Sequence, residues 1–107
     1  MIRIHFERSG GFAGMGMAAT IDSDSLSPQE ERDLRYMVEA AGFFQLPGMI
    51  AAPTTGADRF VYRLAVEVDG QEHTVEMSEA AVPSQLRPLL EWLTTAARKA
   101  RRRGLTP

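Results

Sequence analysis

The sequence has 107 residues, of which 44% are hydrophobic and 24% charged, and its formal net charge is -2. This length and composition are typical of one globular domain, and the slightly negative charge disfavours nucleic-acid binding by the chain as a whole. The absence of cysteine excludes disulfides, thiolate zinc sites and thiol nucleophiles, and no apolar run approaches the ~20 residues that span a membrane.

The N-terminal segment alternates between apolar and polar residues. In IRIHFE, residues 2–7, the apolar side chains fall on every second position, which is the period of a half-buried strand. A glycine-rich stretch, SGGFAGMGM at 9–17, is followed by a second alternating segment that ends near Ile21. We therefore predict a hairpin. The segment MIRIHFER, residues 1–8, lacks the apolar region of a secretory signal peptide, and together with the absence of cysteine it leads us to expect a cytoplasmic protein.

The next segment carries the signals of a helix. Ser27 is a predicted N-cap, Pro28 fits the first helical position, and Glu30 completes a capping box. An apolar stripe at helical spacing follows, made of Leu34, Met37, Val38 and Ala41. Gly42 is the predicted end of the helix.

Two segments follow the helix before the sequence alternates again. FFQLP at 43–47 is too apolar for a free loop, so we expect it to pack on the core. Residues 48–58 have no periodicity and make a connection about twice the usual length, so they are either mobile or functional. Residues 59–77 then predict a second hairpin, with a type I′ turn at Asp69 and Gly70.

The last element is a helix that begins near Pro83 and Ser84. Its predicted buried stripe consists of Leu86, Leu89, Leu90, Leu93 and Ala97. Five cations load its C-terminal end at 98–103, and Gly104 ends it. The predicted fold is therefore α+β in the order ββαββα, with a four-stranded, mainly antiparallel sheet and both helices packed on one face. We predict a single domain over 1–104 and a tail at 105–107.

The residues do not assemble a recognisable catalytic or cofactor site. Gly11, Gly14 and Gly16 have the reverse of the dinucleotide-binding spacing and precede a strand instead of a helix. His5 and His73 are predicted on opposite faces, which argues against a zinc site. We predict neither a cofactor nor a metal nor enzymatic activity.

Charged residues of the second hairpin also have a simpler role than catalysis. Its glutamates, Glu67, Glu72 and Glu76, share a polar face with Arg59 and Arg63, so cross-strand ion pairs are expected. The basic helix end lacks interleaved aromatic residues. We expect it to be solvated or to meet an acidic protein partner, and we do not expect nucleic acid as a partner.

Several blocks, taken in order, resemble the emfourin family of small protein inhibitors of thermolysin-like zinc metalloproteases such as protealysin. They are RSGGFAG at 8–14, FFQLP at 43–47, DRFVYRLAVE at 58–67, HTV at 73–75 and PSQLRPLLEWL at 83–93. The resemblance implies a non-enzymatic inhibitor that occludes the active-site cleft of such a protease with loops. An interaction domain with another partner, docking on the basic helix end, is the alternative.

The resemblance also indicates which residues would contact the protease. An anchor in the cleft should be aromatic or a large aliphatic residue. The candidate partner-binding residues are Gly10, Gly11, Phe12, Ala13, Gly14, Met49 and Ile50. Phe12 could equally fold back as core, with the glycines serving a turn that needs positive φ. We expect a monomer or a weak dimer, without membrane association.

Overall fold

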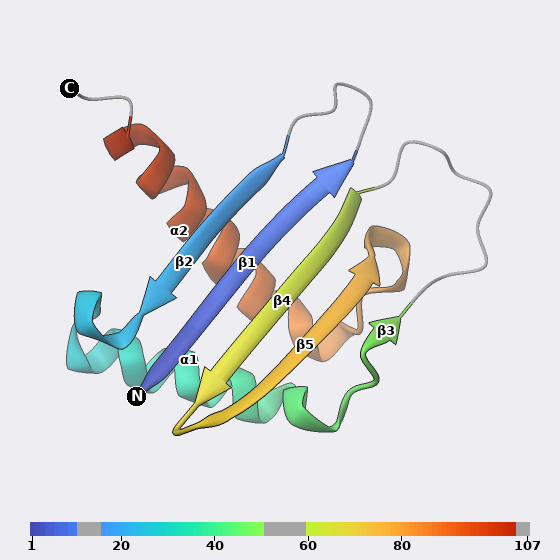
Figure 1. The fold of residues 1–107 in the computed structure, drawn as a ribbon, viewed down its shortest axis with the longest axis horizontal. Helices are drawn as coiled ribbons and strands as arrows, with labels where there is room; N and C mark the ends of the chain where they lie inside the picture. The colour runs from blue at the N-terminus through green and yellow to red at the C-terminus, as the bar shows by residue number, and fades with distance from the viewer. Residues whose placement is uncertain (11–15, 51–59, 105–107) are drawn as a thin grey trace.

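The structure of the protein, a computed structural model, describes residues 1–10, 16–50 and 60–104, with only the backbone described at 80 and 100–104. Five strands and two α-helices follow one another along the chain (Figure 1). They are β1 (Ile2–Gly10), β2 (Met17–Asp22), α1 (Pro28–Ala40), β3 (Met49–Ile50), β4 (Phe60–Val68), β5 (Gln71–Ser78) and α2 (Arg87–Gly104). Short 3₁₀ turns complete the described connections, among them Phe43–Gln45 before β3 and Ser84–Leu86 before α2.

The sheet has five strands in the order β2-β1-β4-β5-β3 and is mixed. The predicted four-stranded sheet and the order ββαββα were therefore wrong in detail, because Met49–Ile50 forms an additional strand parallel to β5. Its pairing is extended by the Gly48 carbonyl, which accepts a hydrogen bond from the Glu76 amide at 2.9 Å. The other strand pairs are antiparallel, as predicted.

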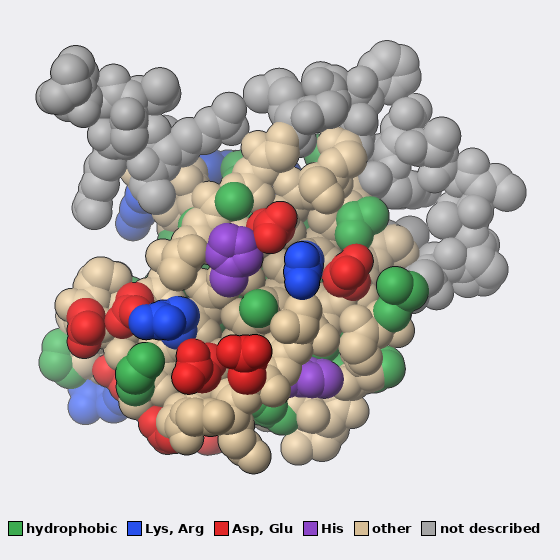
Figure 2. Space-filling model, in the orientation of Figure 1, with side chains coloured by type: hydrophobic (Ala, Val, Ile, Leu, Met, Phe, Trp, Pro, Cys, Tyr) green, Lys and Arg blue, Asp and Glu red, His purple; other side chains and the backbone are tan. Residues whose placement is uncertain are grey.

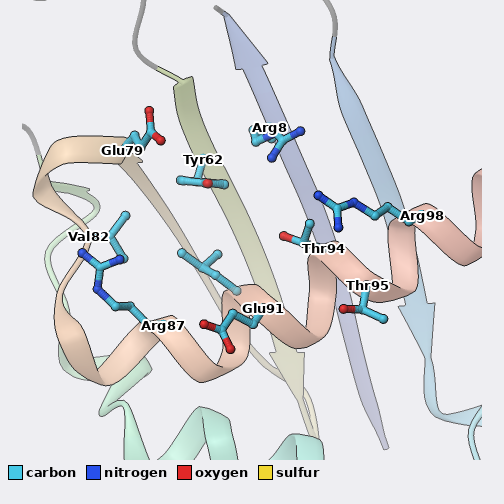
Figure 3. A pocket seen from close by; sticks show the side chains of 10 residues that line it. Arg8, Tyr62, Glu79, Val82, Arg87, Glu91, Thr94, Thr95 and Arg98 are labelled. Atoms are coloured by element: carbon cyan, nitrogen blue, oxygen red, sulfur yellow. The ribbon is translucent and has the colours of Figure 1, made fainter.

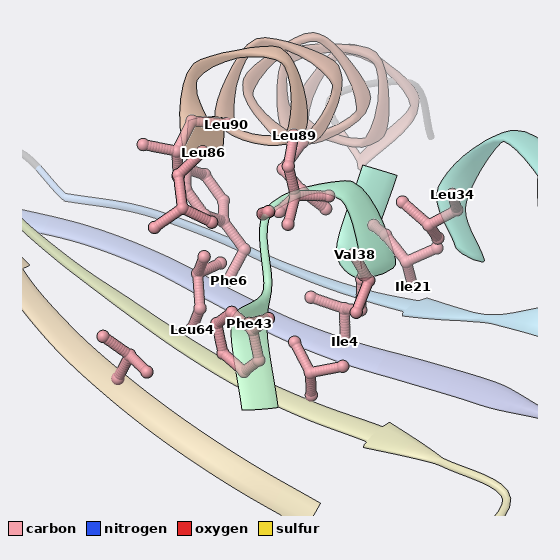
Figure 4. Packing of buried hydrophobic residues seen from close by; sticks show 14 of the residues in the cluster. Ile4, Phe6, Ile21, Leu34, Val38, Phe43, Leu64, Leu86, Leu89 and Leu90 are labelled. Atoms are coloured by element: carbon pink, nitrogen blue, oxygen red, sulfur yellow. The ribbon is translucent and has the colours of Figure 1, made fainter. Parts of the chain in front are cut away.

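Both helices cover one face of the sheet, as predicted, and the other face is open (Figure 1). The core lies between these two layers, where side chains of the inward strand positions meet the apolar stripes of the helices (Figure 4). Phe6, Leu64, Leu34, Phe43 and Leu89 are among the fully buried side chains at this boundary. The alternation of β1 is thus explained by the single covered face.

The ends of α1 and the turn of the second hairpin form as predicted. The Ser27 hydroxyl accepts a hydrogen bond from the Glu30 amide at 3.1 Å, and the Glu30 carboxylate accepts one from the Ser27 amide at 2.9 Å. Gly42 follows the helix with a φ of 62°, which only glycine adopts without strain. Asp69 and Gly70 have φ values of 49° and 89°, and a type I′ turn requires positive φ at both positions.

Replacing Ser27 with alanine should lower the free energy of unfolding by about 1 kcal/mol, because the Glu30 amide loses its acceptor. Urea unfolding followed by circular dichroism measures this loss. Ser84→Ala is the matched control, since Ser84 is exposed and lies within a 3₁₀ turn instead of at the N-cap position. Equal losses in the two variants would contradict the role of the capping box.

Candidate functional site

The two segments proposed to contact a partner start from the same end of the sheet. Gly10, the last residue of β1, is paired with Phe60, the first residue of β4. Ile50 ends β3 beside Met77 of β5, and β5 pairs with β4. Since β1 and β3 are three strand spacings apart in the sheet order, their ends are separated by about 14 Å. The strand order therefore places the C-terminal ends of β1 and β3 at the same end of the sheet. The sequence alone did not specify this order.

The predicted contact residues differ in how much the structure describes of them. Gly10 is exposed and has a φ of 92°, so it uses the freedom of glycine. Gly11, Phe12, Ala13 and Gly14 lie outside the described residues, and their assignment remains a prediction.

The two candidates of β3 face opposite sides of the sheet. Met49 is 67% exposed, whereas Ile50 is partly buried and packs against the core. Met49 is paired with Glu76, whose neighbours Val75 and Met77 are buried, so Met49 stands on the open face. Of the two residues, Met49 is the one available to a partner.

A histidine and two phenylalanines position the chain that leads into β3. Nε2 of His73 lies 2.8 Å from the Leu46 carbonyl oxygen, which can only accept, so this nitrogen carries the proton. The His73 ring contacts the ring of Phe43 edge-on, with centroids 5.5 Å apart, and that of Phe44 at 6.2 Å. FFQLP therefore packs on the core as predicted, and it fixes the approach to Met49.

Arg8 is a residue of this sheet end that the sequence interpretation did not single out. It follows Ile2, Ile4 and Phe6 in the inward phase of β1, and its guanidinium lies 4.5 Å from the centroid of the Phe60 ring. The signal that could have identified Arg8 is that this charged residue continues the every-second-residue pattern of the buried side chains in β1. Arg8 thus places a cation beneath the end of the sheet.

The open face of the sheet is polar and mixed in charge (Figure 2). His5 lies on this face and His73 on the covered one, as predicted. The ion pairs described on the open face join Arg3 to Asp22 at 3.1 Å and His5 to Glu7 at 2.9 Å. Arg63 is in register with Glu76, as expected for a cross-strand pair, but the described ion pairs do not include it.

The described residues do not bring the hairpin carboxylates and histidine into one site. Glu72 and Glu76 project from the open face, whereas His73 projects from the covered face. Within the described ranges, no three His, Cys, Asp or Glu side chains gather as a metal site would need. Neither described α-helix combines the length and the apolar character needed to cross a membrane. The side chains of the basic helix end beyond Lys99 are not described, so a partner docking there remains a prediction.

The opposite end of the sheet carries a charge cluster that joins α1 to the turn between β4 and β5. Nη1 and Nη2 of Arg35 donate to the Asp69 carboxylate at 3.2 and 3.3 Å. The amino group of Met1 donates to the same carboxylate at 2.8 Å. The hydrogen bonds from Arg35, followed by that from the amino terminus, lower the pKa of Asp69 to about 2.

Acid should therefore weaken the fold through Asp69. Its pKa is depressed on folding from 3.8 to about 2, so its stabilising contribution is present above pH ~4 and is lost as the pH falls through 2. We expect Asp69→Asn to lower the free energy of unfolding at pH 7 and to make its decline between pH 5 and pH 2 shallower. Urea unfolding at several pH values measures both effects. Parallel pH profiles for the two proteins would contradict this role.

Comparison with known protein families matches residues 6–94 to the family described as Emfourin. The match spans most of the chain and includes Arg8, the 10–14 segment and β3. No curated protein and no solved structure matches the chain.

Proposed function

Because the chain belongs to the Emfourin family, whose members are protease inhibitors, we propose that it inhibits a thermolysin-like zinc metalloprotease by occluding the active-site cleft. The observation that carries the proposal is the family match over residues 6–94. The order of the sequence blocks that resemble this family supports the finer choice of a thermolysin-like enzyme.

The geometry of the sheet end supports a mechanism in which loops block the cleft. The segments that follow Gly10 and Ile50 start about 14 Å apart on one side of a paired scaffold. A scaffold that holds two contact segments in place lowers the entropy lost on binding. Occlusion of this kind needs no chemistry from the inhibitor, and it is consistent with a site built from glycines, Phe12 and Met49.

Met49 is the described residue best placed to act as an apolar anchor. Its side chain is two-thirds exposed on a two-residue edge strand, beside the polar open face. Anchors of protein interfaces are large side chains that become desolvated within a rim of more polar contacts. We propose that Met49 and Phe12 fill this role together. A cytoplasmic location and a monomeric or weakly dimeric inhibitor complete the proposal.

An inhibition assay tests the proposed function. The purified protein is mixed with a thermolysin-like protease, and hydrolysis of a chromogenic peptide is followed over time. We expect activity to fall at micromolar inhibitor or below, most strongly with a thermolysin-like protease of the same organism. A serine protease assayed in parallel serves as the specificity control and should keep its activity.

Gel electrophoresis of the same mixtures should show that the protein stays intact while the protease is inhibited. Unchanged hydrolysis at micromolar inhibitor with the thermolysin-like proteases of the same organism would overturn the proposal. Rapid cleavage of the protein accompanied by transient inhibition would show a competing substrate and would also overturn it.

A further inference from the structure

A pocket of about 450 Å³ lies between α2 and the covered side of β1 and β4 (Figure 3). Polar side chains dominate its walls, and most of them come from three elements that are far apart in the sequence. Arg8 comes from β1, Tyr62 from β4, and Glu91, Thr94 and Arg98 from α2. This composition differs from the apolar interior a few residues away, where Phe6 and Leu64 are fully buried.

Arg8 has a buried donor that the described residues leave unused. Its Nε atom is inaccessible to solvent and has no hydrogen-bond partner among them. The guanidinium carbon of Arg8 lies over the Phe60 ring, 4.5 Å from its centroid, and this contact engages the charge of the arginine. The ion pairs of the described residues do not include Arg8, so its charge lacks a carboxylate partner there, and an anion in the pocket would supply one.

Arg98 directs a second guanidinium into the same space. Figure 3 shows its side chain reaching from α2 toward Arg8 on β1, with Thr94 close by on the preceding turn of the helix. Neither arginine belongs to an ion pair within the described part of the chain. Two guanidinium groups that lie close together repel each other, and an anion bound between them would attract both.

The two carboxylates of the pocket do not occupy this position. Glu79 is directed to the start of β4, where its Oε1 accepts from the Phe60 amide at 3.5 Å. Glu91 lies one helical turn before Thr94 and two turns before Arg98 on α2, on the side of Arg87 (Figure 3). The space between Arg8 and Arg98 is therefore the cationic part of the pocket.

We propose that this pocket binds an oxyanion, a phosphate or carboxylate group of a small molecule, between Arg8, Arg98 and Thr94. Guanidinium groups bind both kinds of oxyanion through paired, charge-assisted hydrogen bonds, and a threonine hydroxyl can add a third donor. The site does not include the residues proposed to contact the protease. Occlusion of a cleft requires no small ligand, so oxyanion binding would be an additional property of the protein.

NMR titration of the full chain tests the site, with sodium phosphate in one arm and sodium acetate in the other. Sodium chloride at matched ionic strength serves as the reference. We expect saturable shifts at the amides of Arg8, Thr94 and Arg98 and at the guanidinium N–H groups of Arg8 and Arg98. Tighter saturation by phosphate identifies a phosphate ligand, and tighter saturation by acetate identifies a carboxylate. The absence of saturation in both arms, or shifts equal to those with chloride, would overturn the proposal.

Three substitutions localise the binding. Arg98→Gln should weaken it at least about tenfold, because one charge-assisted contact is lost. Arg32→Gln on α1 removes the same charge outside the pocket and should change it less than about twofold. Glu91→Gln should strengthen binding, because a nearby negative charge is removed. Arg98 is exposed, so its variant should melt like the parent protein. Equal weakening by the two arginine substitutions would indicate general charge screening and would overturn the site.

Discussion

Replacing Phe6 with alanine is expected to lower the free energy of unfolding by about 3–5 kcal/mol, the usual cost of deleting a buried aromatic ring. Phe6 is 0% exposed and lies on β1, between β2 and β4. Its ring stacks on that of Tyr62 with centroids 6.1 Å apart. Domains of this size have a total stability of roughly 5–15 kcal/mol, so the variant should be close to the limit of folding.

Urea unfolding at neutral pH measures the loss, and two variants bracket it. Phe6→Leu keeps most of the apolar volume and should cost less than about 1.5 kcal/mol. Tyr36→Ala removes an aromatic ring that is 71% exposed, and its effect should stay within about 0.5 kcal/mol. A loss below about 1.5 kcal/mol for Phe6→Ala would show that the middle of the sheet tolerates a cavity.

The parts of the fold that local signals determine were predictable from the sequence. The alternation of β1 follows from one covered face, and the capping box at Ser27 and the turn at Asp69 depend on neighbouring residues only. The alternation of β4 and β5 and the apolar stripe of α2 also extend over enough residues to be recognised. The prediction that both helices pack on the same face of the sheet was therefore confirmed.

The fifth strand could not be predicted in this way. Met49–Ile50 is too short to show a period, and its partner residues Glu76 and Met77 lie 27 positions later in the chain. Its pairing depends on the free edge of β5 and on the contact of His73 with Leu46, which are both tertiary features. Residues 48–50 therefore read as loop although they continue the sheet.

The residue types proposed for the candidate site remain a prediction, and their arrangement could not be predicted from the sequence. The glycines around Phe12 and the apolar pair Met49 and Ile50 could be recognised along the chain. That β1 and β3 end on the same side of the sheet depends on the strand order. Arg8 is charged, and only its phase in β1 indicates that it lies under the sheet. Register and layer, which are set by packing, thus place Met49 on the open face and Arg8 on the covered one.

Removal of the two proposed anchors should weaken inhibition strongly while preserving the fold. Phe12→Ala is expected to raise the inhibition constant against a thermolysin-like protease by about 30-fold or more, which is the energy of an interface hot spot. Met49→Ala should raise it by about tenfold, and the double variant should combine the two effects. Because Met49 is 67% exposed, its substitution should shift the free energy of unfolding by no more than about 0.5 kcal/mol.

Melting curves recorded beside the inhibition assay separate a contact role of Phe12 from a core role. A contact residue leaves the melting temperature unchanged and weakens inhibition, whereas a core residue costs ~3–5 kcal/mol of stability. Tyr36→Ala, an exposed aromatic on α1, is the control for loss of apolar surface and should inhibit like the parent protein. If Phe12→Ala and Met49→Ala both kept full inhibition, the contact surface would have to lie elsewhere, and the sheet end would be excluded as the region that occludes the protease.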